Sequence, residues 1–509
     1  MNKEYFYITT PIYYVNDVTH IGHLYTTFAG DILKKYHELT GKKVFYLTGT
    51  DEHGIKICQA AKAKDIDVRS FCDMISESFK TSWEKLDIDF DDFIRTTSDR
   101  HKEGVTKVLN KLNEKGLFYK KKYEGLYCSG CEKFLAEDEL VNGECPDHKK
   151  KPELYSEENY FFKLSEFQNQ LIKLIENDTI KILPVYRKNE VLGKLRLGLD
   201  DVSISRKHLT WGIQLPFDTS QVTYVWIDAL SNYITAIGYA DDPEKFNKIW
   251  PCDIHLMAKD ILWFHCVIWP AILLGCELEL PKSLFIHGYF TIGGEKMSKT
   301  LGNVVDPVKI CELYSADAVR FSMFKEATFG LDFDFSEEVI KRRINTDLAN
   351  DLGNLISRST SMTVKYFKGT AENTGISEDP DSDLKSTAEE TIEKYILHMD
   401  KIELRQALEE LWKLITRANK YVEETAPWKL AKENKTDRLK AVLYNLNESV
   451  RLINILLFPF MPKTAFTIKE TIGDNSNILK INIKEIKWNE NYKFGEIKKA
   501  QPLFPKIES

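Results

Sequence analysis

The first hundred residues alternate between short strand-like runs and a longer helical pattern. The run YFYITTPIYY precedes a helical pattern from about Ile21 to Leu39, and a second strand pattern, KKVFYLTGTDEHG, ends in a polar turn. Strand, helix and strand at this spacing predict a parallel α/β unit. Because ligands of such sheets gather at the carboxyl ends of the strands, we expect the polar stretches around His20 and Asp51 at that edge.

The later pattern predicts an interruption, a return to the sheet and a helical region. Turn residues, cysteines and a charged run interrupt the rhythm, and the strand-like segments VTYVWIDAL, DIHLMAKDILWFH and LFIHGYF then resume the sheet. From about Glu337, apolar residues recur every three or four positions, which is typical of packed helices. The sequence therefore predicts a split α/β domain with an insertion, followed by a helical bundle. The expected parts are 1–116 and 221–290 for the sheet domain, 117–220 for the insertion, 291–340 for a linking region and 341–509 for the helices.

Composition narrows the class of protein but does not identify it. The 509-residue chain has a formal net charge of −7, which does not indicate a nucleic-acid-binding protein. Its N-terminus lacks the pattern of a signal peptide, and no apolar stretch is long enough to span a membrane. We therefore expect a multidomain cytoplasmic protein without membrane contact. Nine scattered cysteines in such a reducing compartment argue against a disulfide framework.

Two short motifs are candidates for phosphate chemistry. His20, Gly22 and His23 stand where a helix begins, so backbone N–H groups and two imidazoles can face an anion. Alone, this motif would more often be a polar helix start. The second motif, GGEKMSKTLGN, carries Lys296 and Lys299 on a glycine-hinged loop that can neutralise a leaving pyrophosphate. Alone, it would more often be a solvated basic loop, but the pair together favours a nucleotide site.

Cys128, Cys131, Cys145 and His148 form a C-x-x-C pair followed by a C-x-x-H pair. This spacing can supply three thiolates and one imidazole, a tetrahedral set that suits zinc. Because all four ligands come from the protein, the predicted Zn²⁺ is structural. The other cysteines stand mostly in apolar surroundings and are expected in the core.

The motifs H-I-G-H and K-M-S-K-T, with PIYYVNDVTHIGH, TGTDEHG and APW, resemble those of the methionyl-tRNA synthetases of class I. The resemblance covers nearly the whole chain. It implies a Rossmann-type catalytic domain, a zinc-bearing insertion and a helical anticodon-binding domain. It also implies activation of methionine by ATP with Mg²⁺, and transfer to tRNA(Met), including the initiator tRNA.

The resemblance also assigns roles to individual residues. Catalysis falls to His20, Gly22, His23, Lys296 and Lys299, and the same residues bind ATP with Asp260, His287, Gly288 and Ser298. The methionine pocket is implied to consist of Ile12, Tyr14, Asp51, Trp226, Ala229, Leu230, Tyr233, Ile261 and His265. Asp51 corresponds to the carboxylate that receives the α-ammonium group; from sequence alone, a helix cap is an equally good interpretation.

In the helical region, Asn354, Arg358 and Trp428 match the family residues that read a CAU anticodon. Asn354 and Arg358 are one turn apart on a predicted helix, so they can point at one target. Because the chain ends without the further C-terminal domain that dimerises some relatives, we expect a monomer.

Other functions remain as alternatives. Synthetases for isoleucine, valine and leucine need a large editing insertion for which this chain has no room. A cysteinyl enzyme would place a cysteine before the H-I-G-H motif, where YITTPIYY has none. A tRNA-binding protein that lost catalysis, or a smaller nucleotidyltransferase, is opposed by the intact motifs and the long helical region respectively.

Overall fold

The computed structural model describes residues 3–128, 133–135, 137–146, 149–207, 209–296 and 304–508. The chain divides into two compact units. Unit 1 comprises Met1–Gly30 and Val44–His287, and unit 2 comprises Asp31–Lys43 and Gly288–Ser509. Within the described ranges, no helix is both long and apolar enough to cross a bilayer.

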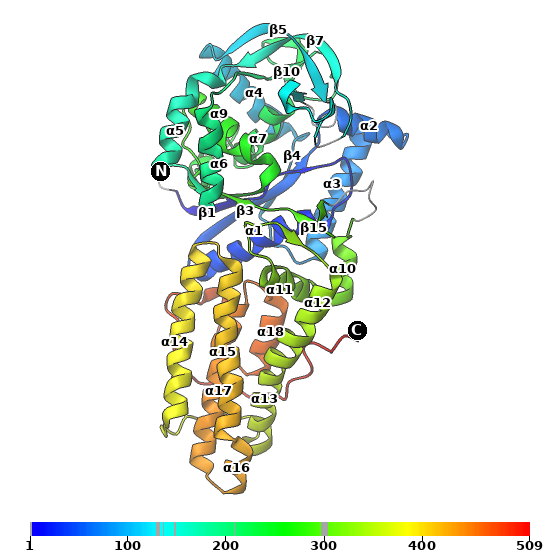
Figure 1. The fold of residues 1–509 in the computed structure, drawn as a ribbon. Helices are drawn as coiled ribbons and strands as arrows, with labels where there is room; N and C mark the ends of the chain where they lie inside the picture. The colour runs from blue at the N-terminus through cyan, green and yellow to red at the C-terminus, as the bar shows by residue number, and fades with distance from the viewer. Residues whose placement is uncertain are drawn as a thin grey trace. The chain divides into compact units, whose positions relative to one another are not determined.

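A parallel sheet forms the centre of unit 1 and is visible edge-on in Figure 1. Its strands are β1 (Tyr5–Thr9), β2 (Tyr13–Tyr14), β3 (Lys43–Asp51), β4 (Asp92–Arg95), β8 (Lys181–Leu183), β13 (Ile254–Ala258) and β14 (Ser283–His287). In the described part of the chain they follow the order β2-β3-β1-β13-β14-β8, with β4 also paired to β3. The pairings β2–β3, β3–β4, β1–β13, β13–β14 and β14–β8 are parallel. The order reverses between β1 and β13, which is where an open α/β sheet binds its ligand.

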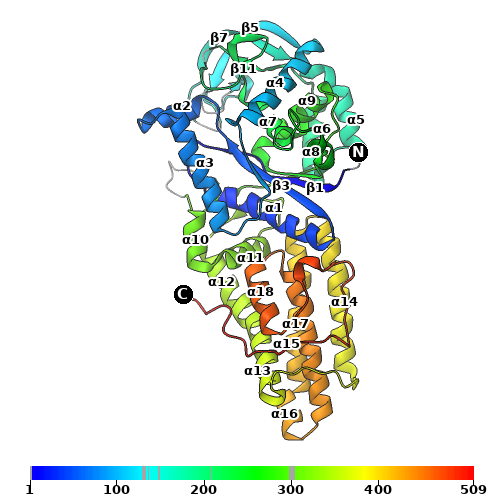
Figure 2. The same cartoon turned by 180° about the vertical axis from the view of Figure 1, so that it is seen from behind.

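Helices cover this sheet and explain its apolar strands, because parallel strands are buried on both faces. They are α1 (Ile21–Leu39), α2 (Ile55–Ala63), α3 (Val68–Lys85), α4 (Asp99–Glu114), α5 (Gln168–Glu176), α6 (Val185–Arg196), α7 (Val225–Thr235), α8 (Pro243–Ile249) and α9 (Trp269–Gly275). Figure 2 shows α4, α7 and α9 packed together on one side of the sheet. The last part of α1, from Asp31 onward, clusters with unit 2.

Two smaller antiparallel sheets lie in the region expected as an insertion. One contains β5 (Phe118–Cys128), β6 (Lys133–Leu135), β7 (Glu153–Phe162) and β9 (Val202–Ser203), and the other β10 (Ser205–Arg206), β11 (Gln214–Leu215) and β12 (Asp218–Thr223). Between β7 and β9, two strands of the first small sheet, the chain returns to the main sheet, because β8 pairs with β14 in parallel. A strand of the main sheet thus interrupts the stretch 117–220.

The expectation that VTYVWIDAL resumes the sheet is wrong. Its beginning ends β12, an antiparallel strand outside the main sheet, and the rest starts helix α7. Of the residues in α7, all but Trp226 are buried, including Ile227, Ala229 and Leu230. A helix buried on every side has no polar stripe, so its short apolar run cannot be told from a strand by periodicity.

Unit 2 contains a three-stranded sheet and a helical bundle within its described residues. The strands are β15 (Phe290–Ile292), β16 (Glu295–Lys296) and β17 (Phe333–Asp334). The helices are α10 (Pro307–Tyr314), α11 (Ala316–Glu326), α12 (Glu337–Arg343), α13 (Asn354–Phe367), α14 (Asp379–Asp400), α15 (Leu404–Thr425), α16 (Pro427–Lys432), α17 (Thr436–Leu457) and α18 (Pro462–Thr471).

The long helices α14, α15 and α17 run side by side in both Figure 1 and Figure 2. On α15 the buried residues Leu404, Ala407, Leu408 and Leu411 recur every three or four positions. This spacing places them on one face, which packs against the neighbouring helices. The predicted helical region is confirmed, although α10 and α11 begin it earlier than Glu337.

Candidate active site

Two histidines stand at the N-terminus of α1. Gly22 N–H donates to His20 Nδ1 at 3.1 Å, and His20 N–H donates to His23 Nδ1 at 3.3 Å. The two imidazole rings stack with their centroids 3.6 Å apart. Because each Nδ1 accepts a hydrogen bond, a neutral ring carries its proton on Nε2. The pair therefore presents Nε2–H donors beside the positive end of the helix dipole, an arrangement suited to phosphate oxygens.

Two aromatic side chains pack against the ring of His23. Its ring lies 4.7 Å from that of Tyr13 and 5.4 Å from that of Phe79, measured between centroids. The Tyr13 hydroxyl is itself 2.6 Å from Thr27 Oγ1 on α1. Burial, and next the charge of His20, lower the pKa of His23 well below its usual value. His23 is therefore a neutral hydrogen-bond donor at neutral pH.

Asp51 closes strand β3, as predicted. Its neighbour in the sheet is Tyr14 on β2, and Val15 N–H donates to the Asp51 carbonyl at 3.1 Å. The structure thus brings together two residues of the predicted amino-acid pocket that are far apart in sequence. Asp51 is a buried carboxylate at the carboxyl edge of the sheet, a suitable place for an ammonium group.

Tyr233 and His265 form the polar part of the predicted pocket wall. The His265 Nδ1 atom lies 3.0 Å from the Ile261 carbonyl, which can only accept, so Nδ1 carries the proton. Nε2 therefore accepts a hydrogen bond from the Tyr233 hydroxyl at 2.7 Å. Burial lowers the pKa of His265 to about 4, which keeps the ring neutral. His265 lies in a π-helical turn, Phe264–Ile268, a local irregularity that often marks functional sites.

The apolar part of the predicted pocket wall comes from α7 and that π-helical turn. Trp226 stacks on Phe264 with 3.5 Å between ring centroids and 11° between planes. Ala229 and Leu230 are buried on α7, and Ile12, Trp226 and Ile261 pack against the same hydrophobic core. Phe264, which the sequence analysis did not name, thus contacts a residue of the predicted pocket. Aromatic rings suit a polarizable thioether.

The predicted adenine site is at the ends of β13 and β14. His287 is the last residue of β14 and pairs with Ala258 at the end of β13, two residues before Asp260. His287 Nε2 lies 2.7 Å from Thr26 Oγ1 on α1. His287, at the end of β14, and Asp260, just after β13, therefore lie at the carboxyl ends of neighbouring strands.

Gly288 begins unit 2 and is tightly enclosed within it. A Cβ atom at this position would lie 2.3 Å from the backbone of Leu331 and Asp332. Next to it, Tyr289 N–H donates to Asp332 Oδ1 at 2.8 Å. Only glycine fits at position 288 without displacing the backbone.

The lysine motif begins on a tight hairpin. Gly293 and Gly294 have φ values of 61° and 78°, which a two-residue hairpin turn requires, between β15 and β16. Gly294 N–H donates to Asp334 Oδ1 at 2.8 Å, and this bond lowers the pKa of Asp334. Lys296 ends β16, whereas Ser298 and Lys299 lie outside the described residues.

Two of the four predicted zinc ligands lie in one buried cluster. Cys128, at the end of β5, is 3% exposed and Cys145 is 1% exposed, and they pack with Leu135 and Leu140. Such a pair of buried thiols fits half of a structural zinc site. Cys131 and His148 lie outside the described residues, and the rest of the described chain holds no metal-binding group of three or more His, Cys, Asp or Glu.

Arg358 and Trp428 are brought together in unit 2. The Arg358 guanidinium lies 5.9 Å from the centre of the Trp428 ring, and Trp428 is 42% exposed. Arg358 Nη2 also pairs with Glu423 Oε1 at 2.5 Å. Asn354 is exposed one turn earlier on α13, as predicted. An exposed aromatic ring beside a guanidinium is suited to stacking with an unpaired base.

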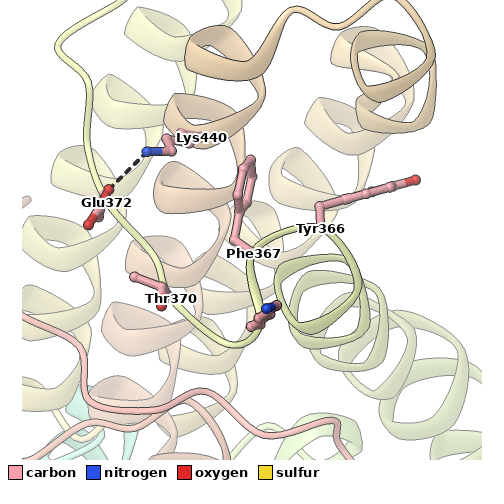
Figure 3. Close-up of a pocket in the computed structure, with 6 residues that line it drawn as sticks. Tyr366, Phe367, Thr370, Glu372 and Lys440 are labelled. Carbon is pink, nitrogen blue, oxygen red and sulfur yellow. Dashed lines mark hydrogen bonds and ion pairs between the residues drawn. The ribbon is translucent and has the colours of Figure 1, made fainter.

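A separate pocket of about 320 Å³ opens at the end of α13. Its lining includes Tyr366, Phe367, Thr370, Glu372 and Lys440, which Figure 3 labels, and also Lys368. Lys440 pairs with Glu372 at 3.0 Å and lies 5.9 Å from the centre of the Phe367 ring. No predicted site residue lines this pocket, and we assign it no function.

A parallel sheet with a histidine pair at one helix start and an acidic strand end beside it is typical of the class I aminoacyl-tRNA synthetases. The family model described as "tRNA synthetases class I (M)" matches residues 6–151 and 147–360. Residues 372–508 match the model described as "Anticodon binding domain of methionyl tRNA ligase".

Similar proteins agree with these matches. The methionine–tRNA ligase of Caldanaerobacter subterraneus subsp. tengcongensis is 47% identical over 99% of this chain and 79% of its own length. That of Bacillus subtilis is 43% identical over 99% of this chain and 78% of its own length. The structure of Mycobacterium tuberculosis methionyl-tRNA synthetase in complex with methionyl-adenylate superposes with a TM-score of 0.94 at 38% identity, covering 99% of this chain and 100% of that one. The chain belongs to the methionyl-tRNA synthetase family.

Proposed function

We propose that this protein is a methionine–tRNA ligase that charges tRNA(Met), including the initiator tRNA, for protein synthesis. The stacked His20–His23 pair at the start of α1, which follows closely on Tyr14 of the Tyr14–Asp51 strand pairing, carries the proposal. The histidines and Asp51 together supply hydrogen-bond donors for phosphate and an acceptor for an ammonium group at one edge of the sheet. The similarity to an enzyme whose structure holds methionyl-adenylate supports the same choice of amino acid.

In the first step, a carboxylate oxygen of methionine attacks the α-phosphorus of ATP. The bond from that phosphorus to the bridging oxygen breaks, and pyrophosphate leaves. No side-chain nucleophile is needed, because in-line placement and charge stabilisation are sufficient. Asp51 holds the ammonium group, and the Nε2–H groups of His20 and His23 donate to phosphate oxygens.

The remaining predicted residues complete this step. His287, Gly288 and Asp260 hold the adenosine, while Lys296, Ser298 and Lys299 contact the leaving pyrophosphate. Mg²⁺ bound with ATP supplies further neutralisation of the phosphate charge. In the second step, a hydroxyl of the terminal adenosine of the tRNA attacks the methionyl carbonyl carbon, and AMP leaves.

The methionine side chain is proposed to lie between α7 and the π-helical turn. Trp226, Ala229, Leu230 and Ile261, with Ile12, form its apolar walls, and Tyr233, hydrogen-bonded to His265, belongs to the core that Leu230 shares. Because both polar groups are hydrogen-bonded to each other, an apolar thioether can enter without leaving a buried donor unpaired.

The decisive experiment is ATP–pyrophosphate exchange by the purified chain with each of the twenty amino acids. We expect exchange with methionine alone. Exchange with another amino acid would keep the reaction but contradict the pocket, and no exchange by folded protein would favour a tRNA-binding protein without catalysis.

We further propose a structural Zn²⁺ held by Cys128, Cys131, Cys145 and His148. When bound, it would cross-link the C-x-x-C pair to the C-x-x-H pair. Elemental analysis should find about one zinc per chain. Cys145→Ser should lose it and Cys58→Ser, at a half-buried position on α2, should retain it; zinc retained in Cys145→Ser would contradict the ligand set.

Anticodon recognition is proposed for Asn354, Arg358 and Trp428, with the Trp428 ring as a stacking surface for an unpaired base.

We also propose that the protein acts as a monomer in the cytoplasm. Light scattering of the purified chain tests the oligomeric state, and a mass near twice 59.0 kDa would contradict it.

A further inference from the structure

A buried carboxylate joins two walls of the proposed methionine pocket. Asp228, on α7, is 1% exposed, and its Oδ2 atom lies 2.6 Å from His53 Nδ1. Its other oxygen, Oδ1, lies 2.7 Å from His101 Nε2 on α4. His53 is 4% exposed and His101 is fully buried, so the three side chains are shielded from water. All belong to unit 1, and none was singled out from the sequence.

The carboxylate determines how both imidazoles are oriented. Burial alone would raise the pKa of Asp228, but the charges and hydrogen bonds of His53 and His101 lower it to about 2. An ionised carboxylate only accepts hydrogen bonds, so His53 must present Nδ1–H and His101 must present Nε2–H. The Nδ1 atom of His101 is held in turn at 2.7 Å from Thr235 Oγ1, at the end of α7.

The two ends of this connection carry pocket residues. His53 stands two positions after Asp51, which is proposed to receive the ammonium group. Asp228 stands between Trp226 and Ala229 on the helix that forms the side-chain wall. The His53–Asp228 bond therefore sets the distance between Asp51, which is proposed to hold the ammonium group, and α7, which is proposed to hold the side chain of methionine.

Glu52, which lies between Asp51 and His53, is fixed by further hydrogen bonds and an ion pair. Arg95 pairs with both carboxylate oxygens of Glu52, at 2.7 and 3.0 Å. Glu52 N–H donates to Thr96 Oγ1 at 2.9 Å, and the Glu52 carbonyl accepts from Trp211 Nε1 at 2.5 Å. With Glu52 so constrained, the His53–Asp228 bond directly connects this segment to α7.

We propose that Asp228 is a positioning residue for methionine. Its bond to His53 holds the Asp51 segment at a defined distance from α7, and the hydrogen bond from His101 to the second oxygen of Asp228 fixes the orientation of the carboxylate. This inference rests on the proposed function. It predicts that loss of the carboxylate weakens methionine binding more than ATP binding, because a displaced pocket wall reduces the fit of the amino acid.

The test is methionine-dependent ATP–pyrophosphate exchange by Asp228→Asn. The amide has the same shape but only one accepting oxygen, so one imidazole loses its acceptor. We expect the KM for methionine to rise at least tenfold while the KM for ATP stays within twofold. His53→Asn, which breaks the connection at the other end, should act in the same direction, and His101→Asn should act less.

A matched control is Asp92→Asn, also in unit 1. Asp92 makes a two-bond pair with Arg100, at 2.7 and 2.8 Å, and contacts none of the pocket residues named above. Thermal unfolding of each variant reports folding separately. The control should leave both KM values within twofold even if its melting temperature falls.

An Asp228→Asn enzyme whose KM for methionine stays within twofold of wild type would overturn the inference. So would equal increases in the KM values for methionine and ATP. If Asp228→Asn does not fold, His53→Asn decides in the same way. Failure of the wild-type chain to exchange with methionine would instead contradict the proposed function, and the inference with it.

Discussion

The proposed amino-acid pocket and the proposed anticodon face of this chain differ in how far their polar side chains are buried. In the pocket, Tyr233 and His265 are 1% and 2% exposed and are hydrogen-bonded to each other. On α13 and α16, Arg358 and Trp428 are in contact with solvent, and Arg358 is held by a surface pair with Glu423.

The difference fits the chemistry of the two proposed ligands. Methionine offers few polar atoms and must be separated from similar apolar side chains, so the pocket needs buried groups with predetermined orientations. RNA bases bring large π faces and remain partly hydrated, so recognition uses exposed rings and charges. Changes in the pocket should therefore have large and localised effects, and changes at the anticodon face smaller ones that appear only with tRNA.

The largest expected effect is that of His23→Ala. It removes a preorganised donor to the transition state, so methionine-dependent exchange should fall by about 10²–10³-fold. Circular dichroism and zinc content should match those of wild type. A loss of less than tenfold would contradict the phosphate role of His23.

Stability of the buried pocket should depend on pH through His265. Its pKa is about 4 in the folded chain and about 6.5 when unfolded, so the unfolded chain takes up the proton first. The stability contributed by the neutral ring is complete above about pH 6.5 and is lost as the pH falls toward 4, by up to about 3 kcal/mol.

Urea unfolding of wild type and His265→Gln, measured at several pH values between 7 and 4, checks this prediction. The wild-type chain should lose more free energy of unfolding than the variant over this interval. Parallel pH dependences for the two proteins would show that His265 is not held neutral by burial.

Trp428→Ala tests the exposed side of the comparison. Loss of one stacking surface corresponds to about 1–3 kcal/mol, so kcat/KM for tRNA charging should fall by about 5- to 150-fold. Methionine-dependent exchange without tRNA should not change. A parallel loss in exchange would mean that Trp428 supports the fold of the chain.

The smallest effect is expected for Glu423→Gln. Exposed ion pairs contribute about 0–1 kcal/mol, so the KM for tRNA should change by no more than about fivefold. That change should shrink at high salt, because exposed charges are screened. A tenfold or larger change would show that Glu423 itself contacts the tRNA.

Local pattern alone was enough for several parts of this protein. Helix α1 begins and ends where the apolar spacing predicts, Asp51 ends its strand, and Asn354 and Arg358 share a helix. These features depend on short-range rules: periodicity, helix starts and the polar residues that follow a parallel strand. The motifs at His20 and Lys296 likewise are contiguous, so they can be read from the order of residues.

Only the tertiary structure decided the rest. The run VWIDAL, whose apolar pattern fits a strand equally well, is part of the largely buried helix α7, and a strand within 117–220 joined the main sheet through pairing with β14. The contacts of Asp228 reach 175 residues back to His53 and 127 back to His101. No local pattern marks such a set, because hydrogen bonds between distant segments exist only once the sheet and α7 have brought them together.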